Sequence, residues 1–203
     1  MDRYTQETAC WLDLRFDRQV YAFMGREYDP YQPLTGIPDG TWNAPRYLMA
    51  ARLIRLASVL GDLRPTSFLD VGGAEGMVAR FVENQFGAES VSIDLSHQAA
   101  LRAKEYSGVL SAAADSARLP FADDSFDVVF LSEVIEHLAN PVRSVLELVR
   151  VAKHAVIITT EAFADTEEAR RQELADRRLE PHMDRSILCE DDFRRLLAPL
   201  MIT

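Results

Sequence analysis

Five short apolar runs alternate with segments of helical periodicity through the middle of the chain. The runs cover residues 67–71, 91–95, 109–114, 126–131 and 155–160, and their length and continuity are typical of strands buried on both faces of a parallel sheet. Apolar residues elsewhere recur every three or four positions, as in helices packed on a sheet. These helical segments are residues 45–60, 76–86 and 141–149. The alternation predicts an α/β fold with a doubly wound, mostly parallel sheet and helices on both faces.

The first apolar run ends in an acid and passes directly into a glycine-rich turn. Asp70 lies at the end of the strand over 67–71, and residues 72–76 separate it from the helical segment over 76–86. Glycine permits positive φ and lets a ligand lie against the backbone near a helix N-terminus. The turn therefore indicates a site for a nucleotide-type cofactor, with the charge of Asp70 in the same crevice. A purely structural connector would have a similar composition.

The glycine spacing separates two kinds of cofactor site. Gly72, Gly73 and Gly76 lack the Gly-x-Gly-x-x-Gly spacing of a nicotinamide-binding turn. They fit the pattern Asp-x-Gly-x-Gly-x-Gly better, with Asp70 in place and Ala74 at the middle glycine position. In this motif the chain resembles the class I S-adenosylmethionine-dependent methyltransferases, whose fold is a Rossmann-like seven-stranded sheet. The resemblance implies that this turn holds S-adenosyl-L-methionine.

Two further strands also end in acids. Asp94 follows Asp70 by 24 residues, close to the roughly 20 expected for a carboxylate that binds ribose hydroxyls. The resemblance makes Asp94 the ribose ligand, places Leu95 against the adenine ring and puts Asp115 and Ser116 beside the adenine. The carboxyl ends of parallel strands lie at one edge of a sheet, where open α/β sheets bind ligands. We therefore expect these residues to line one crevice.

The stretch over residues 119–138 carries the most specific resemblance. It combines Leu119-Pro120-Phe121, Ser125-Phe126-Asp127 and Glu136-His137-Leu138, and it is similar to the ubiquinone-biosynthesis-like branch of the family, methyltransferase type 11. The resemblance adds Ser132 to the cofactor-binding residues. Asn140-Pro141 then opens the next helix as its cap and first residue.

The resemblance implies an enzyme that transfers a methyl group to an O, N or C nucleophile of a small molecule by in-line SN2 displacement. The products would be the methylated acceptor and S-adenosyl-L-homocysteine. The protein must mainly hold the acceptor about 3–3.5 Å from the methyl group, opposite the departing sulfur. His137 or His182 could act as a base for a hydroxyl acceptor. A lone histidine also serves often as a structural hydrogen-bonding residue.

Three alternatives remain open at this point. A non-catalytic adenosylmethionine-binding subunit would keep the cofactor residues without an acceptor pocket. Glu133, Glu136 and His137, with His182, resemble the metal-binding set of small-RNA 2′-O-methyltransferases. The first three residues also occur in the metal-free branch, so we assign no metal site. A nicotinamide oxidoreductase is disfavoured by the glycine spacing.

The family resemblance covers only residues 45–203. Residues 1–44 are rich in aromatic residues and are broken by proline and glycine clusters, and we expect them to form a lid or substrate segment. Packing in the core or in a homodimer would explain the same aromatic residues. At the other end, residues 199–203 begin a sixth strand where the chain stops. The last two strands of the family are thus expected to be incomplete, either by truncation or as a departure that exposes a sheet edge.

Composition limits the partners. The chain has 32 acidic and 22 basic residues and a formal net charge of −10, which argues against sequence-independent binding of nucleic acid. Its two cysteines, Cys10 and Cys189, lie far apart, so we expect no disulfide framework and a cytoplasmic location. No signal peptide and no apolar run near 18 residues is present, so we expect no membrane span.

Overall fold

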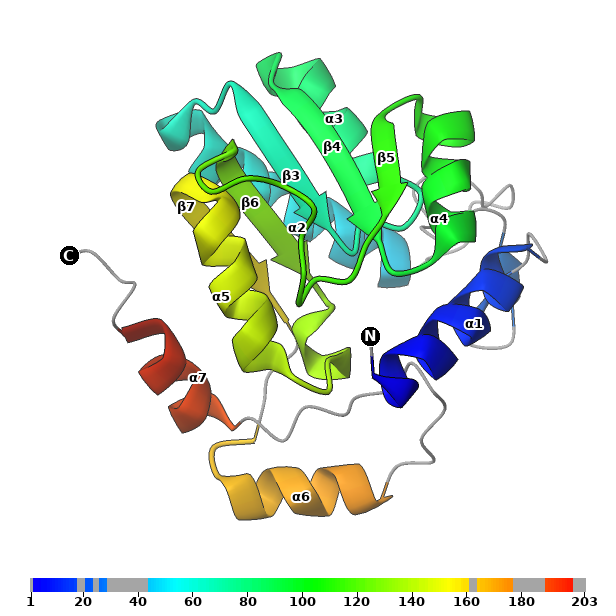
Figure 1. Ribbon diagram of the computed structural model, residues 1–203, viewed down its shortest axis with the longest axis vertical. Helices are drawn as coiled ribbons and strands as arrows, with labels where there is room; N and C mark the ends of the chain where they lie inside the picture. Colours follow the sequence, from blue (N-terminus) through cyan, green and yellow to red (C-terminus); the bar gives the residue numbers. More distant parts are fainter. Residues whose placement is uncertain are drawn as a thin grey trace.

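A five-stranded parallel sheet forms the centre of the computed structural model, which describes residues 2–17, 21–23, 26–28, 44–160, 164–176 and 189–198. The strands are β3 (Ser67–Val71), β4 (Glu89–Asp94), β5 (Leu110–Ala113), β6 (Phe126–Ser132) and β7 (Ala152–Thr159). They pair in the order β5-β4-β3-β6-β7, and every pair is parallel (Figure 1). The chain order reverses at β3, which confirms the predicted doubly wound sheet.

Helices cover both faces of this sheet (Figure 1). The helices are α1 (Arg3–Asp17), α2 (Ala44–Leu63), α3 (Met77–Phe86), α4 (His97–Arg102), α5 (Pro141–Val151), α6 (Glu167–Asp176) and α7 (Glu190–Leu197). A π-helical turn, η1 (Ala103–Ser107), continues α4, and η2 (Ile135–His137) is one 3-10 turn after β6. A separate hairpin pairs β1 (Tyr21–Phe23) with β2 (Arg26–Tyr28). No helix within the described ranges is long and apolar enough to cross a membrane.

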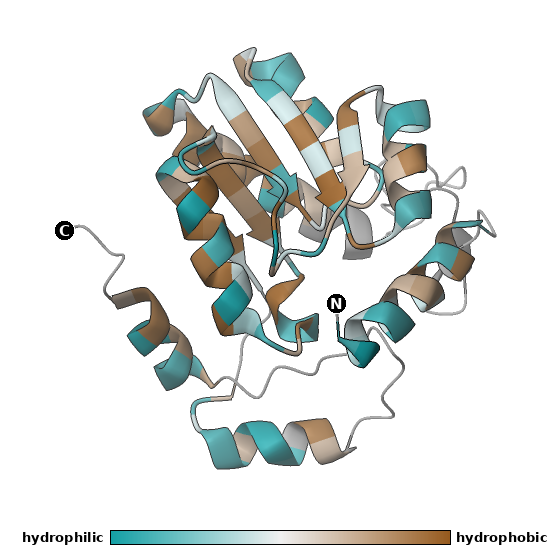
Figure 2. Ribbon diagram, in the orientation of Figure 1, coloured by the Kyte–Doolittle hydropathy of each residue, from teal (hydrophilic) through white to brown (hydrophobic). Residues whose placement is uncertain are grey.

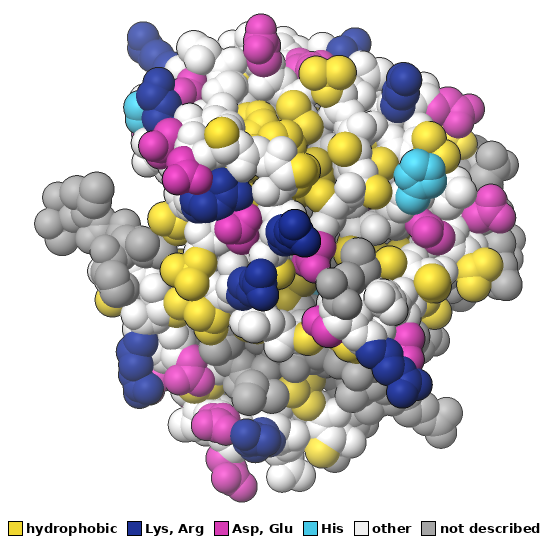
Figure 3. Space-filling model, viewed as in Figure 1, with side chains coloured by type: hydrophobic (Ala, Val, Ile, Leu, Met, Phe, Trp, Pro, Cys, Tyr) yellow, Lys and Arg dark blue, Asp and Glu magenta, His cyan; other side chains and the backbone are white. Residues whose placement is uncertain are grey.

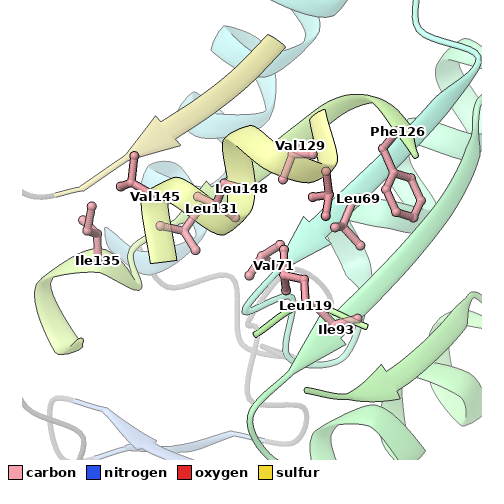
Figure 4. Close-up of a cluster of buried hydrophobic side chains, with 11 residues drawn as sticks. Leu69, Val71, Ile93, Leu119, Phe126, Val129, Leu131, Ile135, Val145 and Leu148 are labelled. Atoms are coloured by element: carbon pink, nitrogen blue, oxygen red, sulfur yellow. The ribbon is translucent and has the colours of Figure 1, made fainter. Parts of the chain in front are cut away.

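Alternate residues of the strands belong to two apolar layers, one on each face of the sheet. Phe68 of β3 packs with Val78 and Val82 of α3 and Leu60 of α2. Its neighbour Leu69 faces the other layer (Figure 4). That second layer contains Leu69, Val71, Ile93, Leu119, Phe126, Val129, Leu131, Ile135, Val145, Leu148 and Val151. Figure 2 shows apolar residues along the central strands and polar residues over much of α6. Because successive side chains of β3 point to opposite faces of the sheet, helices pack against it on both faces.

One buried aspartate joins the starts of β3 and β6. Asp127 Oδ2 accepts hydrogen bonds from Thr66 N at 2.7 Å, Thr66 Oγ1 at 2.6 Å and Ser67 N at 3.3 Å. The Thr66 hydroxyl and amide hold the pKa of Asp127 below its usual value. Because these bonds lie at the amino end of the strands, they fix the register at the edge opposite the carboxyl ends.

Three elements differ from the sequence-based expectation. β7 begins at Ala152, directly after α5, because the strand pairs with Phe126 across a register shift. Between β4 and β5 lie α4 and η1, where no helix was predicted. The α1 helix was not predicted, although Asp2 accepts a hydrogen bond from Thr5 N at 2.8 Å as a cap, and Thr8 and Phe16 lie buried on one face. The expected strand over 199–203 lies outside the described residues.

The second apolar layer gives a test of the packing. Leu148 of α5 is fully buried, whereas Leu146 of the same helix is 58% exposed. We expect Leu148→Ala to lower the free energy of unfolding by about 2–5 kcal/mol, because it leaves a cavity between α5 and the sheet. Leu146→Ala, the control, should cost less than about 0.5 kcal/mol. Equal effects in urea-unfolding curves would contradict this packing.

Candidate functional site

The acids predicted from the strand ends lie at one edge of the sheet. Asp70 of β3 pairs in register with Ser92 of β4, and Asp94 ends β4 opposite Ala113. Figure 1 shows that the strands point with their carboxyl ends toward α1. The side chains of Asp70 and Asp94 are both buried. The sheet therefore brings two of the three predicted carboxylates into one crevice, at the position where the chain order reverses.

The loop after β3 has glycine where no side chain fits. Gly72 has φ +76°, and a Cβ there would lie 2.3 Å from Val134 Cγ2. A Cβ on Gly73 would lie 2.2 Å from Ser92 Oγ and 2.6 Å from Asp70 Oδ2. Both contacts are far shorter than van der Waals distance. The amides of both glycines donate to the carbonyl of Ile93, at 2.8 and 3.0 Å. The backbone thus passes directly over Asp70, as close approach of a ligand requires.

Two residues of this loop, Ala74 and Gly76, have positive φ. Ala74, at the middle glycine position of the motif, has φ +46° and is only 5% exposed. Gly76 has φ +72° and precedes α3. A non-glycine residue at positive φ is uncommon and carries a conformational cost. Ala74 therefore adopts the backbone conformation for which the motif has glycine.

The Asp94 carboxylate is held by backbone amides from two loops. Its Oδ2 accepts from Ala74 N at 3.0 Å, and its Oδ1 accepts from Ser96 N at 2.9 Å. Burial raises the pKa of Asp94 above its ordinary value, although these two hydrogen bonds act in the opposite direction. Each carboxylate oxygen can accept more than one hydrogen bond. Asp94 is thus fixed in orientation while it keeps acceptor capacity, which fits a ligand with neighbouring hydroxyl groups.

The carboxyl group of Asp70 is less well compensated by hydrogen bonds than that of Asp94. Within the described part of the chain, its buried Oδ2 has no hydrogen-bond partner. Burial, together with the nearby charge of Asp94, raises the pKa of Asp70 to about 7. A buried, unsatisfied carboxylate oxygen is costly unless a ligand compensates it. The position fits a positively charged group of a ligand.

A pocket opens beside Asp70 on the side of α2. Its lining is Met49, Arg52, Leu53, Leu56, Asp70, Gly72, Val78, Phe130 and Ser132. Arg52 Nη2 lies 3.1 Å from Glu133 Oε2, and Glu133 has φ +53° at the end of β6. Arg52 is about one-third exposed. This cation was missed by the sequence reasoning, because α2 carries no motif and only tertiary packing brings it to the crevice.

The Glu136-His137 pair lies just past the end of β6, in η2. Glu136 is buried, and its Oε2 accepts from Thr160 Oγ1 at 3.0 Å. The His137 Nε2 atom is 4.0 Å from Glu136 Oε1, and the His137 carbonyl accepts from the Tyr4 hydroxyl of α1 at 3.1 Å. Ser132 shares a 2.6 Å hydrogen bond with Thr159. The structure thus places Ser132 and His137 at the same sheet edge as the acids.

The remaining predicted residues are spread along this edge. Leu95 is half-buried, next to Asp94. Asp115 Oδ1 accepts from Ala117 N at 2.9 Å in a local turn. The Ser116 hydroxyl is buried and shares a 2.9 Å hydrogen bond with Ser144 of α5. Packing with α5 therefore engages Ser116, whereas Leu95 and Asp115 are partly open to solvent.

Two sequence-based expectations concern His182 and a metal site. His182 lies outside the described residues. Among the residues that are described, no group of three or more His, Cys, Asp or Glu side chains is placed to hold a metal ion. Glu133, Glu136 and His137 therefore form no such group by themselves.

Comparisons with known proteins agree with this geometry. Residues 69–159 match the family described as "Methyltransferase domain". The chain is 30% identical over 159 residues to the chloroplastic tocopherol O-methyltransferase of Arabidopsis thaliana, covering 73% of this chain and 44% of that protein. It is 29% identical over 131 residues to the norajmaline N-methyltransferase of Rauvolfia serpentina, covering 57% and 44%. The chain spans less than half the length of these two relatives.

A solved structure shares nearly the whole fold. The geranyl diphosphate C-methyltransferase from Streptomyces coelicolor A3(2) was determined with Mg²⁺, geranyl-S-thiolodiphosphate and S-adenosyl-L-homocysteine. It is similar to this chain with a TM-score of 0.67 at 16% identity, covering 98% of this chain and 79% of that one. At this identity the similarity establishes the common fold alone.

The buried position of Asp70 predicts a pH dependence of stability. Because the folded protein holds the proton of Asp70 up to a pH of about 7, and the unfolded chain releases it near 3.8, ionisation opposes folding between these values. We expect the stability of the wild type relative to Asp70→Asn to fall as pH rises from about 4 to 7, by at most about 1.4 kcal/mol per pH unit. Parallel pH profiles of the two proteins in denaturant titrations would show that Asp70 is not perturbed.

Proposed function

We propose that the chain is a class I S-adenosylmethionine-dependent methyltransferase, which binds S-adenosyl-L-methionine and methylates an O, N or C atom of a small molecule. The observation that carries this proposal is the position of Asp94. Its buried carboxylate is oriented by Ala74 N of the glycine loop and by Ser96 N of its own loop. This orientation supports Asp94 as the acceptor for vicinal hydroxyls, beside a backbone that a ligand can approach closely.

The residues along the edge fit the parts of an adenosyl cofactor. Asp94 would accept from the two ribose hydroxyls, while Leu95 and Asp115, with Ser116 behind them, would border the adenine. The residues of the glycine loop that would lie against the cofactor are Gly72, Gly73, Ala74 and Gly76. Asp70, whose buried Oδ2 has no partner among the described residues, would compensate the cationic amino group.

Arg52 and Ser132 complete the proposed cofactor site. Both line the same pocket as Asp70. Arg52 supplies a positive charge there and would pair with the carboxylate of the cofactor. The Ser132 hydroxyl, shared with Thr159, supplies a neutral polar group. Charges of both signs in one pocket match the two charges of an amino acid.

The bound cofactor supplies an electrophilic methyl group on a sulfonium. The chain itself must place the acceptor about 3–3.5 Å from that methyl group, in line with the bond that breaks, and must exclude water. His137 lies at the sheet edge and could remove a proton from a hydroxyl acceptor; His182 is the second candidate base. An acceptor that is already ionised would need neither residue.

The acceptor is proposed to be a small molecule. The two named relatives act on tocopherol and on norajmaline, according to their names. The formal charge of −10 disfavours nucleic acid, and Figure 3 shows acidic and basic side chains interspersed over the face in view.

We further propose residues 1–44 as a lid or substrate segment and 45–203 as the methyltransferase domain. A cytoplasmic location agrees with the free thiols of Cys10 and Cys189; a homodimer stays open.

Calorimetric titration tests the cofactor assignment. We expect S-adenosylhomocysteine and S-adenosylmethionine to bind with micromolar dissociation constants, and NADH not to bind. Asp94→Ala should lose most of this affinity, because the ribose hydroxyls lose their acceptor. Asp123→Ala, which removes an exposed aspartate near the start of β6, is the control and should bind as the wild type does. NADH binding in place of the adenosyl ligands would refute the proposal, and binding without any turnover in an acceptor screen would favour a non-catalytic subunit.

A second experiment tests the role of His137. With a hydroxyl acceptor found by screening with methyl-labelled cofactor, His137→Ala should lower kcat by about 10²–10⁴, because it removes the base. Its affinity for S-adenosylhomocysteine should remain that of the wild type. His154→Ala changes an exposed histidine near the opposite edge of the sheet and serves as the control. Full turnover in His137→Ala would show that His137 is not the base, and full turnover in His182→Ala as well would show that the enzyme acts by proximity alone.

A further inference from the structure

The N-terminal helix α1 contacts both loops of the proposed cofactor site. Asp13 Oδ1 accepts a hydrogen bond from Ser96 Oγ at 2.5 Å and another from Gln98 N at 3.1 Å. Ser96 lies two residues after Asp94, at the start of α4, and Asp13 precedes it by 83 residues. A single oxygen atom of α1 thus binds the turn that follows the proposed ribose ligand.

Ser96 transmits this contact to Asp94. Its hydroxyl donates to Asp13 and accepts from Ala99 N at 3.1 Å, while its amide donates to Asp94 Oδ1 at 2.9 Å. Ser96 is fully buried. Its side-chain rotamer and its backbone are therefore fixed by the same set of bonds. Removal of the acceptor on α1 would leave the hydrogen of this buried hydroxyl without an acceptor, which costs more than the bond itself contributes.

The apolar side of α1 packs on the other loop. Phe16 is 3% exposed and forms one cluster with Ala74, Ala99 and Leu12. Ala74 stands where the family motif has glycine, and its methyl group is part of this cluster. The substitution that departs from the motif therefore creates a contact between the glycine loop and α1.

A buried ion pair connects the same elements a third time. The carbonyl of Phe16 accepts from Arg102 Nη1 at 3.0 Å. Arg102 Nε lies 3.3 Å from Glu75 Oε1, and Glu75 is fully buried in the glycine loop. Polar groups buried in this way stabilise a structure only when their partners are in place. Departure of α1 would thus remove a partner of Arg102 as well as the acceptor for Ser96.

From these contacts we propose that Asp13 is a positioning residue, through which docked α1 holds Asp94 in the orientation that binds the cofactor ribose. The proposal rests on the proposed cofactor site. Cofactor affinity then depends on the docking of α1, since only the docked population is competent to bind. By reciprocity, the bound ligand must stabilise docked α1 by the same factor.

Binding of S-adenosylhomocysteine, with hydrogen exchange of the α1 amides, tests this coupling. We expect Asp13→Ala to raise the dissociation constant about 5- to 50-fold. Asp13→Asn should restore it to within about threefold, because the amide oxygen can accept the same two hydrogen bonds. Asp17→Ala removes an exposed acid of the same helix and should bind as the wild type does. In the wild type, the ligand should slow exchange of the amides over 3–17.

Each contrary result has a distinct meaning. The proposal is overturned if Asp13→Ala binds as tightly as the wild type, if Asp13→Asn is as weak as Asp13→Ala, or if the ligand leaves exchange over 3–17 unchanged. A general loss of folding in Asp13→Ala would appear as faster exchange in β3 and β6. In that case the wild type decides the proposal, by whether the bound ligand slows exchange of the amides over 3–17. Failure of the wild type itself to bind S-adenosylhomocysteine would instead overturn the proposed function on which this inference rests.

Discussion

Two carboxyl groups, those of Asp70 and Asp94, are buried at neighbouring strand ends, and the site around them is arranged to compensate this cost. Parallel pairing of β3 with β4 sets Asp70 opposite Ser92, and Asp94 lies two residues further along β4 on the same face of the sheet. Burial raises the pKa of both groups. Asp94 is partly compensated by two backbone amides, whereas Asp70 keeps an unsatisfied oxygen within the described residues. Such an arrangement is retained most readily where a ligand supplies the missing charge and hydrogen bonds.

The glycine loop and α1 follow from the same constraint. Because Gly73 passes within contact distance of Asp70 and Ser92, the loop must lack a side chain at that point. Further along, Ala74 carries a methyl group at positive φ, and Phe16 of α1 packs against it. The conformational cost of the alanine is thus offset by apolar burial. The glycine loop of the proposed cofactor site is in this way attached to the N-terminal helix.

Local signals made much of the fold predictable. Near-continuous apolar runs identified the strands, because a parallel sheet covered on both faces favours apolar side chains in its strands. Asn140 was predicted as a helix cap, and its side chain accepts from Arg143 N. The contacts of Asp13 and Arg52, and the packing of Ala74 against α1, were not predictable in this way. Asp13 meets Ser96 across 83 residues, and Arg52 reaches the pocket from a helix without a motif. Such contacts depend on how packed elements meet, which periodicity and spacing do not specify.

A crystal structure of the protein with S-adenosylhomocysteine would test the central claim most directly. The account predicts both ribose hydroxyls within hydrogen-bonding distance of Asp94, the amino group beside Asp70, and α1 in contact with Ala74 and Ser96. A ligand bound elsewhere on the chain, or a ribose held by groups other than Asp94, would contradict it.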